Sequence, residues 1–214
     1  MRYDAVFFDL DGTLLDTSEG ITRATDYVIE KFCLPPLTGE EQKSFIGPPI
    51  QDSFQRHYAL SEAQAWELAT AWRNVYKDLY LFEAMPYEGI YEALRLIRES
   101  GIKIGVATNK REDYSKRLLE HFNFTQLFDC IAGTDLKGEL KKANVIRICM
   151  STVGVLESGR CLMVGDTAND LEAAQKAGVC FLGVTYGFGF RKNCCKKNIA
   201  LANSCIELIT KICV

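Results

Sequence analysis

The apolar residues of this chain fall into two kinds of pattern. Short continuous apolar runs predict strands that are buried on both faces, as in a parallel sheet. These runs cover residues 6–8, 102–107, 128–132, 161–164 and 179–184. Between them, apolar residues recur at helical spacing, and the last such helix is predicted from Ile206, Ile209 and Cys213. Alternating strands and helices favour an α/β fold, with a doubly wound parallel sheet covered by helices on both faces.

Residues 15–83 break this alternation, because they show only helical signals. Patterns typical of capping boxes begin at Thr38 and at Ser61, each with Glu or Gln three residues later. The second one opens a long helix to about residue 80, whose predicted apolar face consists of Ala65, Leu68, Trp72, Val75 and Leu79. We therefore expect an all-α domain at 15–83, inserted into an α/β core made of 1–14 and 84–214.

Composition and charge limit the classes of protein to which this chain can belong. The chain has 214 residues, of which 48% are hydrophobic and 25% charged, a balance typical of a soluble globular protein. Its net charge of -3 gives no general attraction to nucleic acid or to an anionic membrane. No apolar run approaches the ~20 residues of a membrane span. Arg2, Asp4 and Asp9 interrupt the N-terminal apolar residues, so a signal peptide is not expected.

The nine cysteines fit a reducing compartment. Cys130, Cys149, Cys161 and Cys180 lie among apolar residues and are expected in the core as reduced thiols of a cytoplasmic protein. Cys194 and Cys195 are adjacent and have lysines on both sides. A metal site there would need a second Cys or His pair at ligand spacing, and none is present. We expect a solvated loop instead.

The first apolar run ends in Asp9-Leu10-Asp11-Gly12-Thr13. Open α/β sheets bind ligands where their strands end, and Asp9 occupies such a position. Two nearby carboxylates repel each other unless a cation or a proton lies between them. The pair therefore suggests a hard metal ion, Mg²⁺ first, although an acidic turn after a strand is the alternative interpretation.

Three further places along the chain offer polar groups at strand ends or helix starts. They are Thr108-Asn109, Lys141-Lys142, and Asp166 with Asp170. Strand ends meet at one edge of a doubly wound sheet, so all of these groups can converge with Asp9 and Asp11. Carboxylates for Mg²⁺, a hydroxyl, amides and an ammonium together predict a phosphate site. The two adjacent lysines leave open which one contributes the ammonium.

This set of motifs resembles the haloacid dehalogenase superfamily. Its four motifs are matched in order by the segment at 9–13, by Thr108, by Lys142 and by the segment at 165–170. The inserted helical domain is similar to the family's cap, and the core would be Rossmann-like. The stretches at 45–49 and 85–89 look closest to the phosphoglycolate-phosphatase-like branch.

The resemblance agrees with roles that follow from the chemistry of the residues. Asp9 would attack phosphorus and form an aspartyl-phosphate, while Asp11 would protonate the leaving group and later take a proton from water. The Mg²⁺ ligands would be Asp9, the carbonyl of Asp11 and Asp166, with Asp170 contacting a metal-bound water. The residues expected to bind the phosphoryl group are Gly12, Thr108, Asn109 and Lys142.

The leading hypothesis is a Mg²⁺-dependent phosphatase acting on a small phosphorylated metabolite, either phosphoglycolate-like or a nucleoside monophosphate. A phosphomutase of the same family is an alternative, since it differs in how the cap excludes water. A dehalogenase would not need the acid Asp11, because halide leaves without a proton, and a non-catalytic phospho-aspartate regulator would not need it either. We expect residues 45–49 and Arg56 to line the leaving-group pocket. The oligomeric state stays open.

Overall fold

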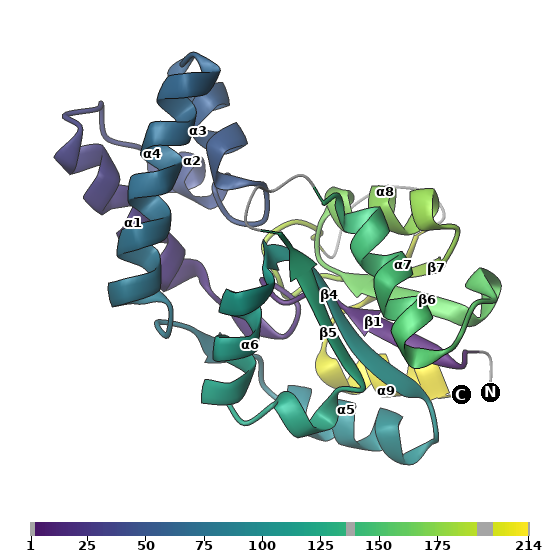
Figure 1. Cartoon of the computed structure of the whole chain (residues 1–214). Helices are drawn as coiled ribbons and strands as arrows, with labels where there is room; N and C mark the ends of the chain where they lie inside the picture. Colours follow the sequence, from purple (N-terminus) through teal and green to yellow (C-terminus); the bar gives the residue numbers. More distant parts are fainter. Residues whose placement is uncertain (1–2, 136–139, 192–198, 214) are drawn as a thin grey trace. The chain divides into compact units, whose positions relative to one another are not determined.

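Six parallel strands form one sheet in the order β5-β4-β1-β6-β7-β8 in this computed structural model, which describes residues 3–135, 140–191 and 199–213 (Figure 1). Their bounds are Ala5–Phe8 for β1, Lys103–Arg111 for β4, Cys130–Thr134 for β5, Cys161–Gly165 for β6, Cys180–Val184 for β7 and Ala200–Ala202 for β8. The predicted α/β class with a doubly wound parallel sheet is confirmed. Cys194 and Cys195, expected in a loop, lie outside the described residues.

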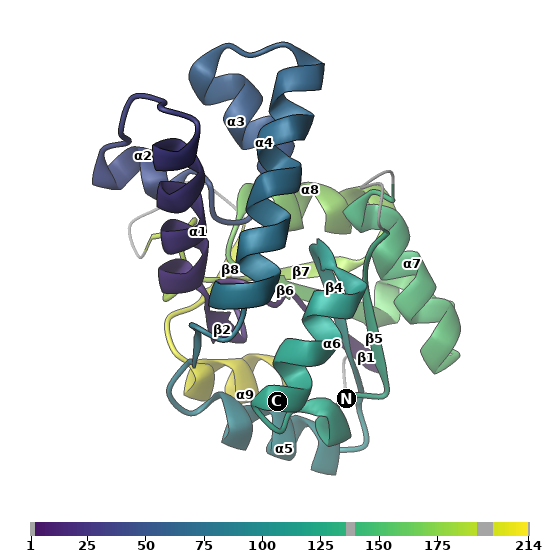
Figure 2. The same ribbon diagram turned by 60° about the vertical axis from the view of Figure 1, so that its left-hand side comes forward.

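Helices cover both faces of this sheet (Figures 1 and 2). On one face, α7 (Lys142–Val153) and α8 (Ala168–Ala177) share a core with alternate residues of the strands, such as Phe7 and Met163. On the other face lie α5 (Ile90–Glu99), α6 (Glu112–His121) and α9 (Cys205–Cys213). Single 3₁₀ turns at Thr125–Leu127 and Ser158–Arg160 lead into β5 and β6.

The strand order reverses at β1, because the chain first adds β4 and β5 on one side of β1 and later β6, β7 and β8 on the other. β1 is thus enclosed by two parallel neighbours, and Val6, Phe7 and Phe8 are fully buried. A reversal of this kind opens a crevice at the carboxyl ends of the two strands that flank it. Here those strands are β1 and β6.

Three elements of the core differ from their predicted form. Strand β4 continues to Arg111 instead of ending at residue 107, because its pairing with β5 resumes at Arg111 and Thr134 after a register shift. Strand β8 has no counterpart in the predicted elements. Helix α9 buries Leu208 and Ile212 rather than Ile206, which is 73% exposed. Both sets have helical spacing, and packing against α5 selects between them.

The chain divides into two units, residues 17–85 and the remainder, whereas the sequence suggested 15–83 for the inserted block. The two connections run through β2 (Leu15–Asp16) and β3 (Met85–Pro86). The helices of the smaller unit are α1 (Ser18–Lys31), α2 (Gly39–Lys43), α3 (Ile50–Tyr58) and α4 (Glu62–Val75), followed by a π-helical segment at Tyr76–Tyr80.

Local signals in the smaller unit were mostly correct. Both capping boxes form, at Thr38 and at Ser61. The apolar face of α4 packs on α1, where the indole N–H of Trp72 donates to the Thr25 hydroxyl at 3.0 Å. Leu79 does not belong to that face and is 61% exposed, because the i→i+5 turns of the π-helical segment change the angular spacing of its residues. No helix of the described residues has the length and apolar character that crossing a bilayer requires.

Candidate active site

The register of the sheet determines which residues meet at its carboxyl edge. Phe8 of β1 is paired with Val106 of β4 and with Val164 of β6. The next residue, Asp9, continues this pairing, since its backbone N–H donates to the Val164 carbonyl at 2.9 Å. Asp9 therefore lies between the residues that follow β6 and the polar end of β4.

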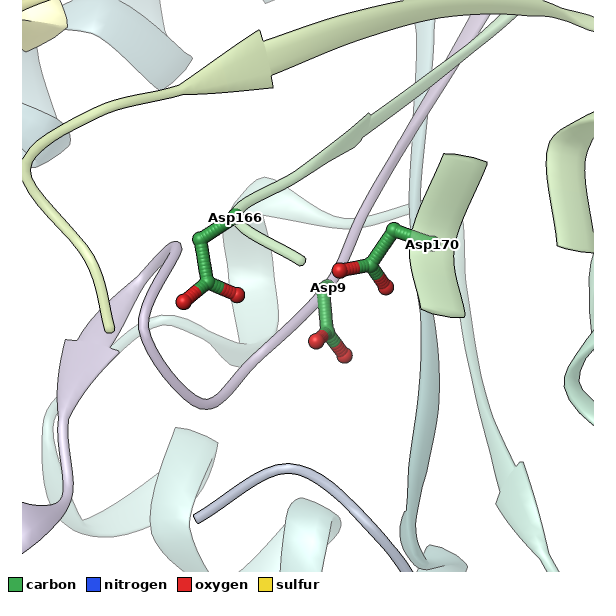
Figure 3. Close-up of side chains that lie close together, drawn as sticks. All are labelled: Asp9, Asp166 and Asp170. Atoms are coloured by element: carbon green, nitrogen blue, oxygen red, sulfur yellow. The ribbon is translucent and has the colours of Figure 1, made fainter. Parts of the chain in front are cut away.

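Three carboxylates converge at this edge (Figure 3). Asp9 follows β1, Asp166 follows β6, and Asp170 lies in the first turn of α8. One ligand oxygen from each lies within 4.8 Å of the others, and all three residues are buried. Buried carboxylates at this separation are a cluster that a cation stabilises, because they otherwise repel one another.

The loop after β7 fixes the orientation of Asp166. The backbone N–H groups of Phe188 and Gly189 donate to Asp166 Oδ2 at 2.7 and 3.3 Å. The other oxygen, Oδ1, is buried and accepts no hydrogen bond from any described residue. A buried oxygen without a partner is costly, so this atom is well suited to coordinate a cation.

Asp170 differs from Asp166 because both of its oxygens are engaged. Oδ2 accepts from the backbone N–H and the hydroxyl of Thr167, at 2.9 and 2.6 Å. Oδ1 accepts from the ammonium of Lys142. This arrangement suits a residue that orients its neighbours more than one that binds a cation directly.

Lys142 is the first residue of α7, and its ammonium lies 2.7 Å from Asp9 Oδ1 as well as against Asp170. Burial disfavours its charged form, but the carboxylates of Asp170 and Asp9 outweigh this and hold the pKa of Lys142 above its usual value. Lys141, the residue before the helix, is exposed. The structure therefore places Lys142 and not Lys141 at the site.

The electrostatics of the cluster fit a divalent cation. Burial, together with the charges of Asp170 and Asp11, raises the pKa of Asp9 to about 7 against the opposing effect of Lys142. Burial and the charges of Asp170 and Asp9 likewise raise the pKa of Asp166 to about 8. Burial is the largest cause of both shifts, and the neighbouring carboxylates add to it. Hard oxygen ligands around such a space are the donor set that Mg²⁺ prefers.

Thr108 and Asn109 occupy the irregular end of β4. Thr108 is 1% exposed, and its hydroxyl oxygen accepts from the backbone N–H of Lys110 at 3.2 Å. The carbonyl of Asn109 accepts from the Thr134 hydroxyl at 2.9 Å, which ties this stretch to β5. Both residues are thus held by the sheet at the same edge as Asp9. Asp9 is one residue beyond the last β1–β4 pair, Phe8 with Val106, and Thr108 is one residue beyond the pair of Ala107 with Ala132 in β5.

Asp11 lies in the turn after β1, and its side chain makes a contact that sequence reasoning missed. The ammonium of Lys110 lies 3.0 Å from Asp11 Oδ1, and the two side chains are only 6% and 10% exposed. Lys110 appeared in the sequence as an ordinary polar residue after a strand. Its location two residues beyond Thr108, at the same strand end, was the signal that could have identified it.

Glycines allow the turn after β1 and the loop after β7 to approach each other. Gly12 has a φ of +78°, and a Cβ there would lie 2.3 Å from Asp166 Oδ2. A Cβ on Gly187 would lie 2.2 Å from the Gly12 carbonyl oxygen. Gly12 was predicted at the site and the loop was not, although Gly187 and Gly189 lie three and five residues after a predicted strand.

A doubly wound sheet with clustered acids and a helix-start lysine at its switch point is the framework of an α/β enzyme for anionic substrates. Comparison with known proteins specifies the family. A family model described as haloacid dehalogenase-like hydrolase matches residues 6–184. The chain belongs to this family of enzymes, as the sequence motifs suggested.

Individual relatives are similar over most of their length. The chain is 36% identical over 190 residues to a 5'-nucleotidase of Pseudomonas aeruginosa, which covers 88% of this chain and 86% of the relative. It is 30% identical over 192 residues to a phosphoglycolate phosphatase of Neisseria gonorrhoeae, covering 86% and 81%. The crystal structure of a predicted phosphatase from Clostridium acetobutylicum matches 99% of both chains with 36% identity and a TM-score of 0.92.

The close approach at Gly187 generates a testable prediction. Gly187→Ala should lower the free energy of unfolding by about 1–3 kcal/mol, because the added methyl group meets the Gly12 carbonyl and the Asp166 side chain. Gly159→Ala is the matched control, since a Cβ there meets no atom within 4 Å, and it should change stability by less than about 0.5 kcal/mol. Denaturant unfolding measures both. Equal effects of the two substitutions would contradict the described packing.

Proposed function

We propose that the protein is a Mg²⁺-dependent phosphatase that hydrolyses small phosphomonoesters through an aspartyl-phosphate on Asp9. The observation that carries the proposal is the position of Asp9 at the switch point, beside Lys142 and within reach of two further carboxylates. A nucleophilic carboxylate needs its negative charge and that of the phosphoryl group to be offset, and this site offers both an ammonium and a cation site for that purpose.

The proposed reaction consists of two successive displacements at phosphorus. In the first, a carboxylate oxygen of Asp9 forms a bond to phosphorus while the bond from phosphorus to the leaving-group oxygen breaks, and Asp11 gives that oxygen its proton. In the second, water attacks the phosphorus of the aspartyl-phosphate and passes a proton to Asp11. This step releases inorganic phosphate and restores the Asp9 carboxylate.

Other residues would hold the phosphoryl oxygens and the cation. The Thr108 hydroxyl and the Lys142 ammonium would contact the phosphoryl group, with Gly12 and Asn109 contributing backbone or amide groups. Mg²⁺ would be held by Asp9, the Asp11 carbonyl and Asp166. Asp170 would contact a water molecule bound to the ion. When bound, the ion supplies charge neutralisation for the phosphoryl group and the surrounding carboxylates.

We also propose that residues 17–85, the inserted cap, select the substrate. The groups assigned to the chemistry all lie outside this unit. Within it, Phe45 packs edge-on against Phe54 with ring centroids 5.2 Å apart, so replacing Phe45 would disturb the unit's own core. Arg56 in the last turn of α3 is exposed and is the better residue to test. The names of the two relatives suggest acidic phosphoesters and nucleoside 5'-monophosphates as the first substrates to compare.

The first prediction of this proposal concerns the nucleophile. Asp9→Asn should lower kcat by roughly a thousandfold or more, because the amide cannot form the covalent intermediate. Acid quenching with ³²P-labelled substrate should label the wild-type protein and not this variant. Asp4→Asn, at an exposed ion pair with Arg160, should retain full activity and labelling. Substantial turnover by Asp9→Asn would refute the assignment.

The second prediction concerns the cation, and it can be tested by a measurement that does not depend on catalytic activity. Mg²⁺ at about 100 times its Kd should raise Tm by roughly 5–10 °C, because the ion binds only the folded protein. Asp166→Asn should lose this shift, since it removes the charge of the carboxylate that holds the unpartnered Oδ1. Asp4→Asn should retain it. EDTA should abolish hydrolysis, and unchanged activity in EDTA would count against the proposal.

The third concerns substrate choice. Arg56→Ala should change the ratio of kcat/KM between 2-phosphoglycolate and a nucleoside 5'-monophosphate by about threefold or more, with little effect on p-nitrophenyl phosphate. Gln55→Ala, at the preceding exposed position of α3, is the control and should leave the ratio unchanged. If Arg56→Ala lowered all three values by one common factor, a selective role for this residue would be wrong.

A further inference from the structure

The site contains two buried ammonium groups that contact different carboxylates. Lys142 contacts Asp9 and Asp170, whereas Lys110 lies 3.0 Å from Asp11. The proposed reaction uses Lys142 to hold phosphoryl oxygens but gives no task to Lys110. A lysine side chain that is only 6% exposed is rare unless an opposite charge lies beside it, and here that charge is the Asp11 carboxylate. The proposed reaction does not explain why these two side chains are paired.

The backbone around Lys110 is built to aim this side chain. Pairing between β4 and β5 is interrupted between Ala107 and Arg111, an irregularity of the kind that re-aims side chains next to active sites. Within it, the Lys110 N–H donates to the Thr108 hydroxyl at 3.2 Å. On the other side, a Cβ on Gly133 would lie 2.4 Å from the Lys110 carbonyl oxygen, so β5 fits tightly against this residue. The position of Lys110 is therefore fixed from both sides.

We propose that Lys110 is the positioning residue for Asp11, holding its carboxyl group where the leaving group and the attacking water exchange their protons. This inference rests on the proposed function. Asp11 sits in a turn closed by backbone bonds, such as that from the Gly12 N–H to the Leu15 carbonyl at 2.8 Å. These bonds fix the backbone of the turn, and the Lys110 ammonium contacts the Asp11 side chain itself. Proton transfer requires a positioned group, and a misplacement of about 1 Å costs on the order of a hundredfold in rate.

In this proposal the two lysines have different roles. Lys142 starts helix α7 beside the nucleophile, whereas Lys110 comes from strand β4 and reaches the proton-transfer residue. Loss of Lys110 should therefore reduce kcat while binding of the phosphoryl group stays intact. If Lys110 were instead a phosphoryl ligand, its loss would weaken the binding of inorganic phosphate.

The contact itself is tested by a double-mutant cycle on the stability of the metal-free protein. Lys110→Met should lower Tm by about 5–15 °C, because it leaves the buried Asp11 carboxylate without its cation. Adding Asp11→Asn should recover part of this loss, since a neutral amide no longer needs the ammonium. Effects that simply add would show that the two side chains are not coupled.

The positioning role is tested by the same cycle on hydrolysis of 2-phosphoglycolate, a nucleoside 5'-monophosphate and p-nitrophenyl phosphate. Lys110→Met should lower kcat by about a hundredfold on the best substrate and leave the inhibition constant of inorganic phosphate within about twofold. In the Asp11→Asn background, the same substitution should change kcat by less than about threefold. Lys110→Arg should restore part of the lost rate. Lys103→Met, on the exposed start of β4, is the control and should retain wild-type kcat.

Three results would overturn the inference. They are a wild-type kcat in Lys110→Met, an equally large loss of kcat in the Asp11→Asn background, or a phosphate inhibition constant that rises tenfold or more. Failure of the proposed function gives a different pattern, because the wild-type protein itself would then hydrolyse none of the three phosphoesters. The stability cycle would still report whether the two side chains interact.

Discussion

Mutual repulsion among buried carboxylates is the constraint around which the core of this protein is arranged. Parallel strands deliver Asp9 and Asp166 to one edge of the sheet, and the first turn of α8 adds Asp170. Burial alone would drive such groups to protonate, as the raised pKa values of Asp9 and Asp166 show. The Lys142 ammonium offsets part of this negative charge, and the unpartnered oxygen of Asp166 is an atom that could bind a cation. A carboxylate cluster of this kind is costly for folding, and the same charge makes it able to attract a cation.

The glycines near the site follow from this constraint. The loop after β7 can bring two backbone N–H groups to Asp166 only if it passes within van der Waals distance of the turn after β1. Gly12 and Gly187 make that approach possible, and the Tyr186 hydroxyl adds a bond to the Thr13 carbonyl at 3.1 Å. Backbone donors are well suited to this task, because they hold one oxygen of the carboxylate without neutralising its charge. The second oxygen therefore stays available for a cation.

The three strands that end at the candidate active site differ in how regular their ends are. β1 and β6 end cleanly, so Asp9 and Asp166 are placed by simple register. β4 instead remains in the sheet to Arg111 and places Thr108 and Lys110 in an irregular stretch tied to β5. Within this stretch the Lys110 N–H donates to the Thr108 hydroxyl, so the interruption of the ladder holds both residues at one strand end.

The sequence alone determined the fold class, the family and the residues of the acidic cluster. Continuous apolar runs and the motif at residues 9–13 are local signals, and the convergence of strand ends is a general property of parallel sheets. Helix starts at Thr38 and Ser61 were predicted for the same reason, since a capping box lies within four residues.

Only the tertiary structure decided which of several equivalent patterns is used. Lys141 and Lys142 are indistinguishable in sequence, and the direction of the first turn of α7 buries one of them beside Asp9. Helix α9 had two faces of acceptable spacing, and α5 selected the one with Leu208. Lys110 and the loop at Gly187 were missed because their contacts join segments far apart in the chain, to Asp11 and to Gly12. Such contacts depend on distances in the folded sheet, so the positions of Lys110 and Gly187 after strands did not by themselves reveal their partners.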